Sequence, residues 1–431
     1  MNKSSTIRTI IAVCLVATVL RWSGGAAAEP AAGSPAPELE TRNSELDTAP
    51  ALERAENVMA LFAKLLCSGV FVVGRAPEEF IENDLKPAWL PGMPDLEKIH
   101  FEVDRERQRV VARMDGVPER VAVYNGDQGC TLCPRGEEQV HFTPVAISRS
   151  PQSSPGLPHP GQTIAQTPEQ EVWQPPATKT EEILWPMGDM IDAAQQPPEV
   201  DQAALAEALD YAFDDLRLAA PQRTRAIVVV YKGQIIAERY APGFTQDTRH
   251  IGWSMGKSIT AALVGILVGQ GHFKVDDPAP IAAWHQEPDP RSVITIAHLM
   301  RMSSGLDFTM GNPANGLMFT NEDDHSRVYF GAINVFDYSI SQPLEFPPNT
   351  VWRYRNCDPL TLGKIIRDMV EQQGENYLTF PQRALFDKIG ARHFVLEPDP
   401  WGNFIMTGFD YGTARDWARF GLLHLWDGVW Q

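Results

Sequence analysis

The sequence predicts an α+β fold of the α/β-sandwich type, in which an antiparallel sheet is flanked by helices and joined by an all-helical subdomain. Three observations lead to this prediction. Two apolar, β-branched runs at 227–231 and 234–237 flank a Lys-Gly pair, which is the pattern of a tight hairpin. Residues 259–268 are apolar nearly all round, as in a helix buried inside a protein. From 278 to about 370, the pattern is typical of short helices and loops.

Composition divides the 431 residues into four segments. We predict a signal peptide at 1–28, a small mixed N-terminal addition at 29–150, a proline-rich linker at 151–200, and a larger domain at 201–431. The larger domain begins with an amphipathic helix over 203–218, ahead of the hairpin.

The first 28 residues have the features of an export signal. Lys3 and Arg8 precede an apolar run over 10–20, and Ala26-Ala27-Ala28 supplies small residues for cleavage. A membrane anchor is the alternative, but the run is well short of the roughly 20 residues that a spanning helix needs. The sequence therefore favours a periplasmic or secreted protein without stable membrane insertion.

The N-terminal addition shows a helical pattern over 52–66 and strand-like runs at 70–73, 110–114 and 121–124. The linker that follows holds 10 of the 35 prolines, which favours an extended connection. Its apolar stretch 184–187 is expected to dock on the larger domain, because a solvated linker has little use for such residues.

Charge argues against a nucleic-acid partner. Removing the signal peptide takes away Lys3, Arg8 and Arg21 but no acid, so the formal charge changes from -18 to -21. Nucleic-acid binding depends on neutralising phosphates with basic side chains, which such a surface does not favour.

Four cysteines remain after cleavage, and in an oxidising compartment their even number permits three pairings. Of these we favour Cys67 with Cys130. Cys130 and Cys133 form a CxxC, but no second pair or histidine cluster accompanies it, so neither a zinc site nor a redox site is expected. We predict no metal and no cofactor.

Ser254 satisfies two catalytic signatures that exclude each other. In Gly252-Trp253-Ser254-Met255-Gly256 it occupies a G-x-S-x-G elbow, whose serine is activated by a distant histidine. With Lys257 it forms S-x-x-K, in which the lysine one helical turn later is the base. The elbow needs a buried parallel strand before the serine, whereas residues 246–250 are polar and poorly strand-forming. We therefore favour the lysine signature.

A second motif supports this choice. Tyr354-Arg355-Asn356 is a Tyr-x-Asn that lies 100 residues after Ser254. Each motif alone is expected by chance about 0.3 to 0.4 times in a chain of this composition, so their joint occurrence carries the argument.

With both motifs, residues 201–431 resemble the serine β-lactamase and penicillin-recognising family, in its class C and esterase-like branch. The stretches 298–306 and 414–421 are similar to segments that recur there. The resemblance is nearest to the 6-aminohexanoate-dimer hydrolase-like members, and it implies a β-lactamase/transpeptidase-like fold.

The resemblance implies a serine hydrolase that forms an acyl-enzyme with a small amide or ester. Ser254 would be the nucleophile, Lys257 the base and Tyr354 the partner in proton transfer, whereas Asn356 would bind substrate or orient the lysine. The Ser254 backbone N–H would be one oxyanion donor. A D-alanyl-D-alanine peptidase, or a penicillin-binding sensor without turnover, is the alternative. Which substrate is used and which oligomer forms are left open.

The family has a third motif, K-T-G or H-x-G, on a late strand. Only His159-Pro160-Gly161 and Lys388-Ile389-Gly390 come near it, and neither lies where the family would place it. Members of the family also continue for roughly a hundred residues past the position of Gln431, so the resemblance implies a domain truncated at its C-terminus.

Overall fold

The computed structural model describes residues 49–88, 93–147, 182–192, 197–215, 222–312 and 315–430. The predicted signal peptide and most of the predicted linker lie outside the described residues, and so does His159-Pro160-Gly161. The four-segment division of the chain therefore stays a prediction.

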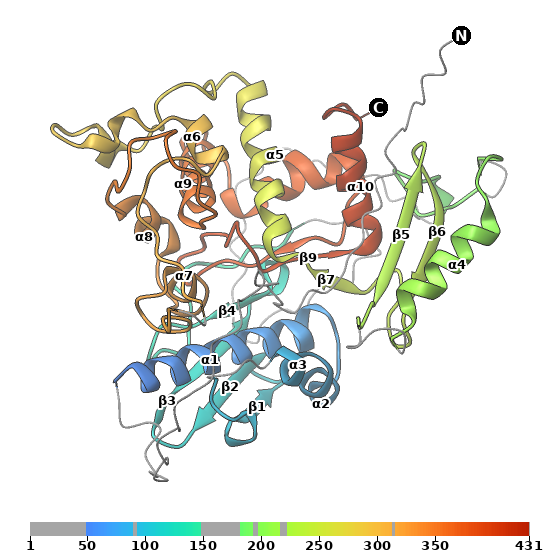
Figure 1. Ribbon diagram of the computed structural model, residues 1–431, viewed down its shortest axis with the longest axis horizontal. Helices are drawn as coiled ribbons and strands as arrows, with labels where there is room; N and C mark the ends of the chain where they lie inside the picture. The colour runs from blue at the N-terminus through green and yellow to red at the C-terminus, as the bar shows by residue number, and fades with distance from the viewer. Residues whose placement is uncertain are drawn as a thin grey trace, which may run out of the picture.

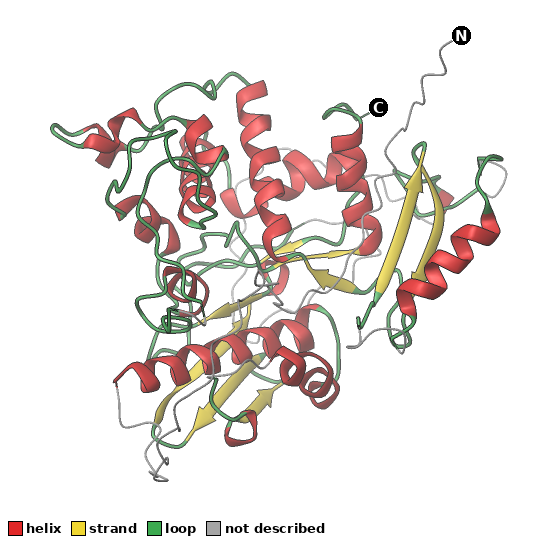
Figure 2. Cartoon of the chain, in the orientation of Figure 1, coloured by secondary structure: helices red, strands yellow, loops and turns green. Residues whose placement is uncertain are grey.

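The fold is mixed α+β, as predicted, and its paired strands are antiparallel (Figure 2). Three sheets have the strand orders β1-β2-β3-β4, β5-β6 and β7-β9-β8. The strands are β1 His100–Asp104, β2 Arg109–Met114, β3 Val117–Tyr124, β4 Cys130–Leu132, β5 Ala226–Tyr231, β6 Gln234–Tyr240, β7 Arg249–Ile251, β8 Val395–Leu396 and β9 Asp410–Thr413. The helices are α1 Ala49–Cys67, α2 Pro77–Phe80, α3 Lys86–Ala88, α4 Gln202–Phe213, α5 Gly256–Gly269, α6 Ile296–Met300, α7 Asp324–Phe330, α8 Val335–Ser341, α9 Cys357–Gln372 and α10 Ala414–Leu425.

In the N-terminal part, α1 lies along the first sheet (Figure 1). The predicted helix and the strands at 110–114 and 121–124 are confirmed, but the strand at 70–73 is wrong. Those residues continue α1 as a wider helical turn, Ser68–Val72. Packing overrides their β-branched character, because this turn buries Val70 and Val72 in the same core as α1. The predicted disulfide between Cys67 and Cys130 is confirmed.

Among the described residues, one helical stretch, Ala49–Val72, is long and apolar enough to cross a membrane. Its most apolar window is 89% buried inside the protein. The apolar surface of this helix is thus buried in the core of the N-terminal part.

The predicted hairpin is confirmed as β5 and β6. Lys232 and Gly233 have φ values of 48° and 82°, the two positive angles that a two-residue hairpin turn requires. The amphipathic helix before it is confirmed as α4, which ends at Phe213, earlier than predicted. Trp185 from the apolar stretch 184–187 is 4% exposed and donates from Nε1 to the carbonyl of Gly233 at 2.9 Å, so the expected docking of this stretch is confirmed.

Helix α5 occupies the middle of the larger part, between α10 and the region of α6, α8 and α9 (Figure 1). It ends at Gly269, as the sequence predicts. The expectation of burial all round is wrong, however. Ile259, Leu263 and Leu267 face the core, whereas Gly265 and Gly269 are exposed. Some apolar residues of α5 are therefore only partly buried by the described residues.

The N-terminal part and the larger part share one core. Residues of α1, β2 and β3 cluster with Phe330, Ile405, Phe409 and Tyr411. A buried ion pair, Lys64 with Glu397, lies in the contact between the two parts. Residues of the N-terminal part thus pack directly against the larger part, including Tyr411 of β9.

Candidate active site

The candidate nucleophile lies where β7 turns into α5. Gly252 follows β7, and a 3-10 turn, Trp253–Met255, leads into the helix. The sequence argument that residues 246–250 do not form a strand is wrong for Arg249–Ile251. These residues pair with β9 because the β9 backbone supplies the hydrogen-bond partners. The strand is antiparallel and at the sheet edge, however, so the context of the hydrolase elbow is still not met.

Ser254, Lys257 and Tyr354 converge. Lys257 Nζ donates to Ser254 Oγ at 3.1 Å, and the Tyr354 hydroxyl donates to the same oxygen at 2.6 Å. The ammonium also lies 4.9 Å from the centre of the Tyr354 ring. A tyrosine 100 positions after Ser254 is thus brought to the same hydroxyl as Lys257, and the contacts expected for the lysine signature are present.

The electrostatics of Lys257 suit a base. Burial lowers its pKa from the ordinary value to about 7, and the nearby Asp410 acts in the opposite direction. A large fraction of the amine is therefore neutral near pH 7 and able to accept a proton. Ser254 is exposed and remains accessible to a substrate.

Asn356 does not reach the nucleophile directly. It is 1% exposed, and its amide nitrogen bonds to Nδ1 of His325 at 2.8 Å. Its side-chain oxygen and Nε2 of His325 have no hydrogen-bond partner in the described part of the chain. Burial lowers the pKa of His325 to about 4, so the imidazole is neutral at pH 7. Asn356 thus lies in a buried layer next to the site, and its predicted contact with substrate stays a prediction.

Sequence reasoning missed Tyr329 on α7. Its hydroxyl donates to the carbonyl of Thr407 at 2.9 Å, and Lys257 Nζ donates to the same carbonyl at 3.3 Å. The Tyr329 ring packs edge-on against Trp253, the residue before the nucleophile. The Thr407 carbonyl therefore joins Lys257 and Tyr329, and Tyr329 belongs to the surroundings of the lysine. No local motif marks either residue, because the contacts form only in the folded chain.

Asp410 at the start of β9 was also missed, and it lies directly beneath the nucleophile turn. It is 2% exposed, and neither of its carboxyl oxygens has a hydrogen-bond partner among the described residues. A Cβ added to Gly256 would lie 2.5 Å from Oδ1 of Asp410, and one added to Gly252 would clash with Oδ2 and with Trp417. The two glycines of the apparent elbow are thus explained by close packing against Asp410.

Burial raises the pKa of Asp410 well above its ordinary value. Because the unfolded chain releases this proton near pH 3.9 whereas the folded chain retains it, wild-type stability is lost as the pH rises above about 4. We expect Asp410→Asn to be more stable than wild type, by a margin that grows with pH at up to about 1.4 kcal/mol per unit.

Urea titrations of both proteins between pH 5 and pH 8 measure this margin. Asp247→Asn, which replaces an exposed carboxylate, controls for the change of net charge. A margin for Asp410→Asn that stays constant over this range would contradict a protonated, buried Asp410.

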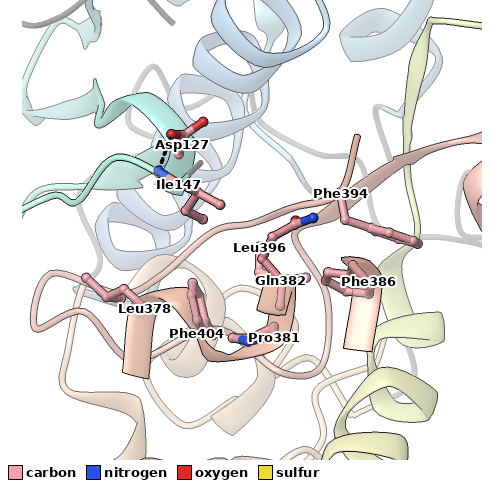
Figure 3. A pocket seen from close by; sticks show the side chains of 9 residues that line it. All are labelled: Asp127, Ile147, Leu378, Pro381, Gln382, Phe386, Phe394, Leu396 and Phe404. Carbon is pink, nitrogen blue, oxygen red and sulfur yellow. Dashed lines mark hydrogen bonds between the residues drawn. The ribbon is translucent and has the colours of Figure 1, made fainter. Parts of the chain in front are cut away.

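Ser254 is exposed at the surface of the described residues. Two small, partly open cavities of about 10 Å³ each lie in the described part of the chain, and each has room for about one water. One lies between the N-terminal part and the larger part, where Asp127 accepts a hydrogen bond from the Ile147 backbone at 2.7 Å (Figure 3). Neither is lined by Ser254, Lys257 or Tyr354. Substrate access is therefore from the exposed side of Ser254.

Three further expectations concern the metal site, the third motif and the CxxC pair. Within the described residues, no group of three or more His, Cys, Asp or Glu side chains could hold a metal ion. Lys388 and Ile389 lie in a 3-10 turn and Gly390 follows with φ of 71°, so this stretch is not the late strand that carries the third motif. Cys133 is buried, and burial raises its pKa to about 12, which makes it a poor thiolate.

Comparison with known proteins places this geometry in a family context. Residues 219–429 match the family model described as Beta-lactamase. The 6-aminohexanoate-dimer hydrolase of Paenarthrobacter ureafaciens is 25% identical over 213 residues, which are 48% of this chain and 53% of that protein. The chain thus spans about half the length of this curated relative.

Solved structures are similar over comparable lengths. A D-amino acid amidase from Ochrobactrum anthropi SV3 is 20% identical with a TM-score of 0.35, covering 47% of this chain and 65% of that one. The octameric penicillin-binding protein homologue from Pyrococcus abyssi is 17% identical with a TM-score of 0.38, covering 53% and 57%.

Proposed function

Residues 219–429 form a β-lactamase family domain, and from this premise we propose that the protein is a serine hydrolase that cleaves a small amide or ester through an acyl-enzyme. The single observation that carries the proposal is the shared contact of Lys257 and Tyr354 with Ser254 Oγ. A serine hydroxyl is a weak nucleophile at neutral pH and needs a base within hydrogen-bond reach. Lys257 lies within hydrogen-bond distance of Ser254 Oγ, and its lowered pKa lets it accept a proton near pH 7.

In the proposed reaction, neutral Lys257 takes the proton of Ser254 as Oγ attacks the substrate carbonyl. Ser254 belongs to the first turn of the helix, where backbone N–H groups lack intrahelical partners and the dipole favours negative charge, so its own N–H stabilises the oxyanion. Tyr354 passes a proton to the leaving group as the carbonyl is restored. Water then attacks the acyl-enzyme, with the same two residues moving protons in reverse order.

For the substrate class we propose a short linear amide or ester. Support comes from the relative named as a 6-aminohexanoate-dimer hydrolase, because the dimer in that name is a linear amide. A β-lactam remains within the same chemistry, since it too acylates a serine. Of the two predicted roles of Asn356, binding substrate or orienting the lysine, we propose the second, because Asn356 is buried and lies near Tyr329, whose hydroxyl shares the Thr407 carbonyl with Lys257.

We also propose that the protein is exported. The disulfide between Cys67 and Cys130 supports this proposal, because disulfides persist mainly in oxidising compartments. The predicted signal peptide supplies the means, and its cleavage would place the mature chain in the periplasm or outside the cell.

The proposed function is tested by following an acyl adduct on the full chain. We expect a fluorescent penicillin or a fluorophosphonate to label the peptide that contains Ser254, as read by mass spectrometry, and Ser254→Ala to remain unlabelled. We expect a p-nitrophenyl ester to be turned over repeatedly by the wild type.

The alternatives predict different kinetics in the same experiment. A penicillin adduct that never clears, with no ester turnover, would support a sensor and overturn hydrolysis. Turnover of a D-alanyl-D-alanine peptide in preference to a linear amide would support the peptidase. Labelling that persists in Ser254→Ala would overturn the assignment of the nucleophile.

A further inference from the structure

Trp352 has the largest exposed fraction among the big apolar side chains of the described residues, at 68%. It lies two positions before Tyr354, which is itself 37% exposed while its hydroxyl contacts Ser254. A single exposed apolar side chain is common on protein surfaces, so the exposure of Trp352 carries no argument by itself. What distinguishes Trp352 is its position beside a candidate catalytic tyrosine.

The chain around Trp352 presents its side chain outward. Residues 351–355 belong to no helix or strand, and both Trp352 and Tyr354 are exposed there, at 68% and 37%. Side chains two residues apart in extended chain lie on one side, with a rise of about 6.6 Å between them. Trp352 and Tyr354 therefore share the outer side of this segment.

The inner side of the segment is firmly attached. The Arg353 backbone N–H donates to the Met302 carbonyl at 3.2 Å, and its guanidinium pairs with Glu345 at 2.7 Å. Arg355, fully buried, donates to the carbonyls of Leu306 and Arg353. Such contacts fix the backbone that follows Trp352, so little backbone freedom is lost there when a ligand covers the indole.

We propose that Trp352 is a specificity-determining residue that binds an uncharged, apolar leaving group of the substrate. The inference rests on the proposed function, because Tyr354 protonates the leaving group and that group must therefore lie over Tyr354. Trp352 is the next side chain on the same side. The substrate class is thus an ester or amide whose alcohol or amine portion carries an aliphatic chain or a ring.

Two matched ester series test this inference on the full chain. One series keeps an acetyl group and lengthens the alkoxy group from methyl to hexyl, and the other keeps p-nitrophenol and lengthens the acyl chain. For wild type, we expect kcat/KM to rise along the alkoxy series by about two- to fourfold for each methylene that contacts the indole. In Trp352→Ala that rise should disappear, whereas the dependence on acyl length should stay unchanged.

Two further variants give the experiment its resolution. Trp352→Phe should keep part of the alkoxy dependence, because a ring is still present. Tyr211→Ala removes another exposed aromatic, on α4, and should behave as wild type. An unchanged alkoxy dependence in Trp352→Ala, or an equal loss in both series, would overturn the inference. A wild type with no turnover that depends on Ser254 would instead overturn the proposed function on which it rests.

Discussion

Replacing Lys257 by methionine should lower kcat/KM for an ester by about 10³-fold or more, because the amine positioned to take the Ser254 proton is lost. Methionine fills a similar volume, so the loss is chemical and not one of packing. The rate of covalent labelling should fall in parallel, since the base acts in acylation. Stopped-flow ester kinetics and timed fluorophosphonate labelling measure both quantities.

The pH profile gives an independent readout of the same residue. The folded pKa of Lys257 lies near 7, so kcat/KM of wild type should rise with pH through about 7 as the amine loses its proton. The contribution of Lys257 to stability changes with pH in the same direction. Between pH 7 and the ordinary lysine pKa, the unfolded chain binds a proton at Lys257 that the folded chain does not, so the contribution of Lys257 to the free energy of unfolding rises with pH over that range, opposite in sign to that of Asp410. Lys257→Met should lack both dependences.

Histidine variants separate the two readings of the serine motif. His393→Ala and His424→Ala should leave acylation nearly intact, since His393 is paired with Asp416 and His424 with the Phe420 carbonyl. His325 is a less clean control, because it contacts Asn356 next to the site. An essential histidine together with a dispensable Lys257 would overturn the lysine mechanism.

Replacing Glu397 by alanine should lower the free energy of unfolding by about 3–5 kcal/mol, since it leaves the Lys64 ammonium buried without its partner. Both side chains are almost completely buried. Ser68 Oγ and the Cys130 backbone N–H donate to Glu397 as well, each at 2.8 Å, so the carboxylate ties α1 and the disulfide to the larger part. Urea unfolding followed by circular dichroism measures the loss.

A double variant distinguishes the unpaired charge from lost packing. Lys64→Met combined with Glu397→Leu should recover most of the stability, because two apolar side chains replace both desolvated charges. Lys86→Ala removes an exposed pair with Glu82 and should cost less than about 1 kcal/mol. If Glu397→Ala were no more costly than Lys86→Ala, the contact between the two parts would not depend on this ion pair.

The same pair is connected to the nucleophile through aromatic contacts. Lys64 Nζ lies 4.5 Å from the centre of the Phe409 ring, and Phe409 lies 5.3 Å from Trp253, which precedes Ser254. The N-terminal part therefore supports the nucleophile turn from behind. Local sequence patterns could not predict these contacts, because each contact joins residues more than 150 positions apart.

Periodicity and turn chemistry alone predicted the hairpin and the C-terminal end of α5, since these depend on neighbouring residues. The helical turn Ser68–Val72 could not be predicted in this way, because the same β-branched residues are common in strands and serve equally well in a buried helix. Periodicity also could not predict that α5 is buried on one face only, because it shows which residues are apolar but not which of them other segments cover.

For the site, the sequence by itself was enough to predict the candidate nucleophile and its candidate base, because Ser254 and Lys257 are one helical turn apart and helix geometry brings them together. Tyr354 followed from a motif. Only the tertiary structure decided that the Tyr354 hydroxyl reaches Ser254, that Asn356 is buried and that Asp410 lies under the turn. The physical reason is that helix geometry acts within a few residues, whereas desolvation and packing depend on which distant segments meet.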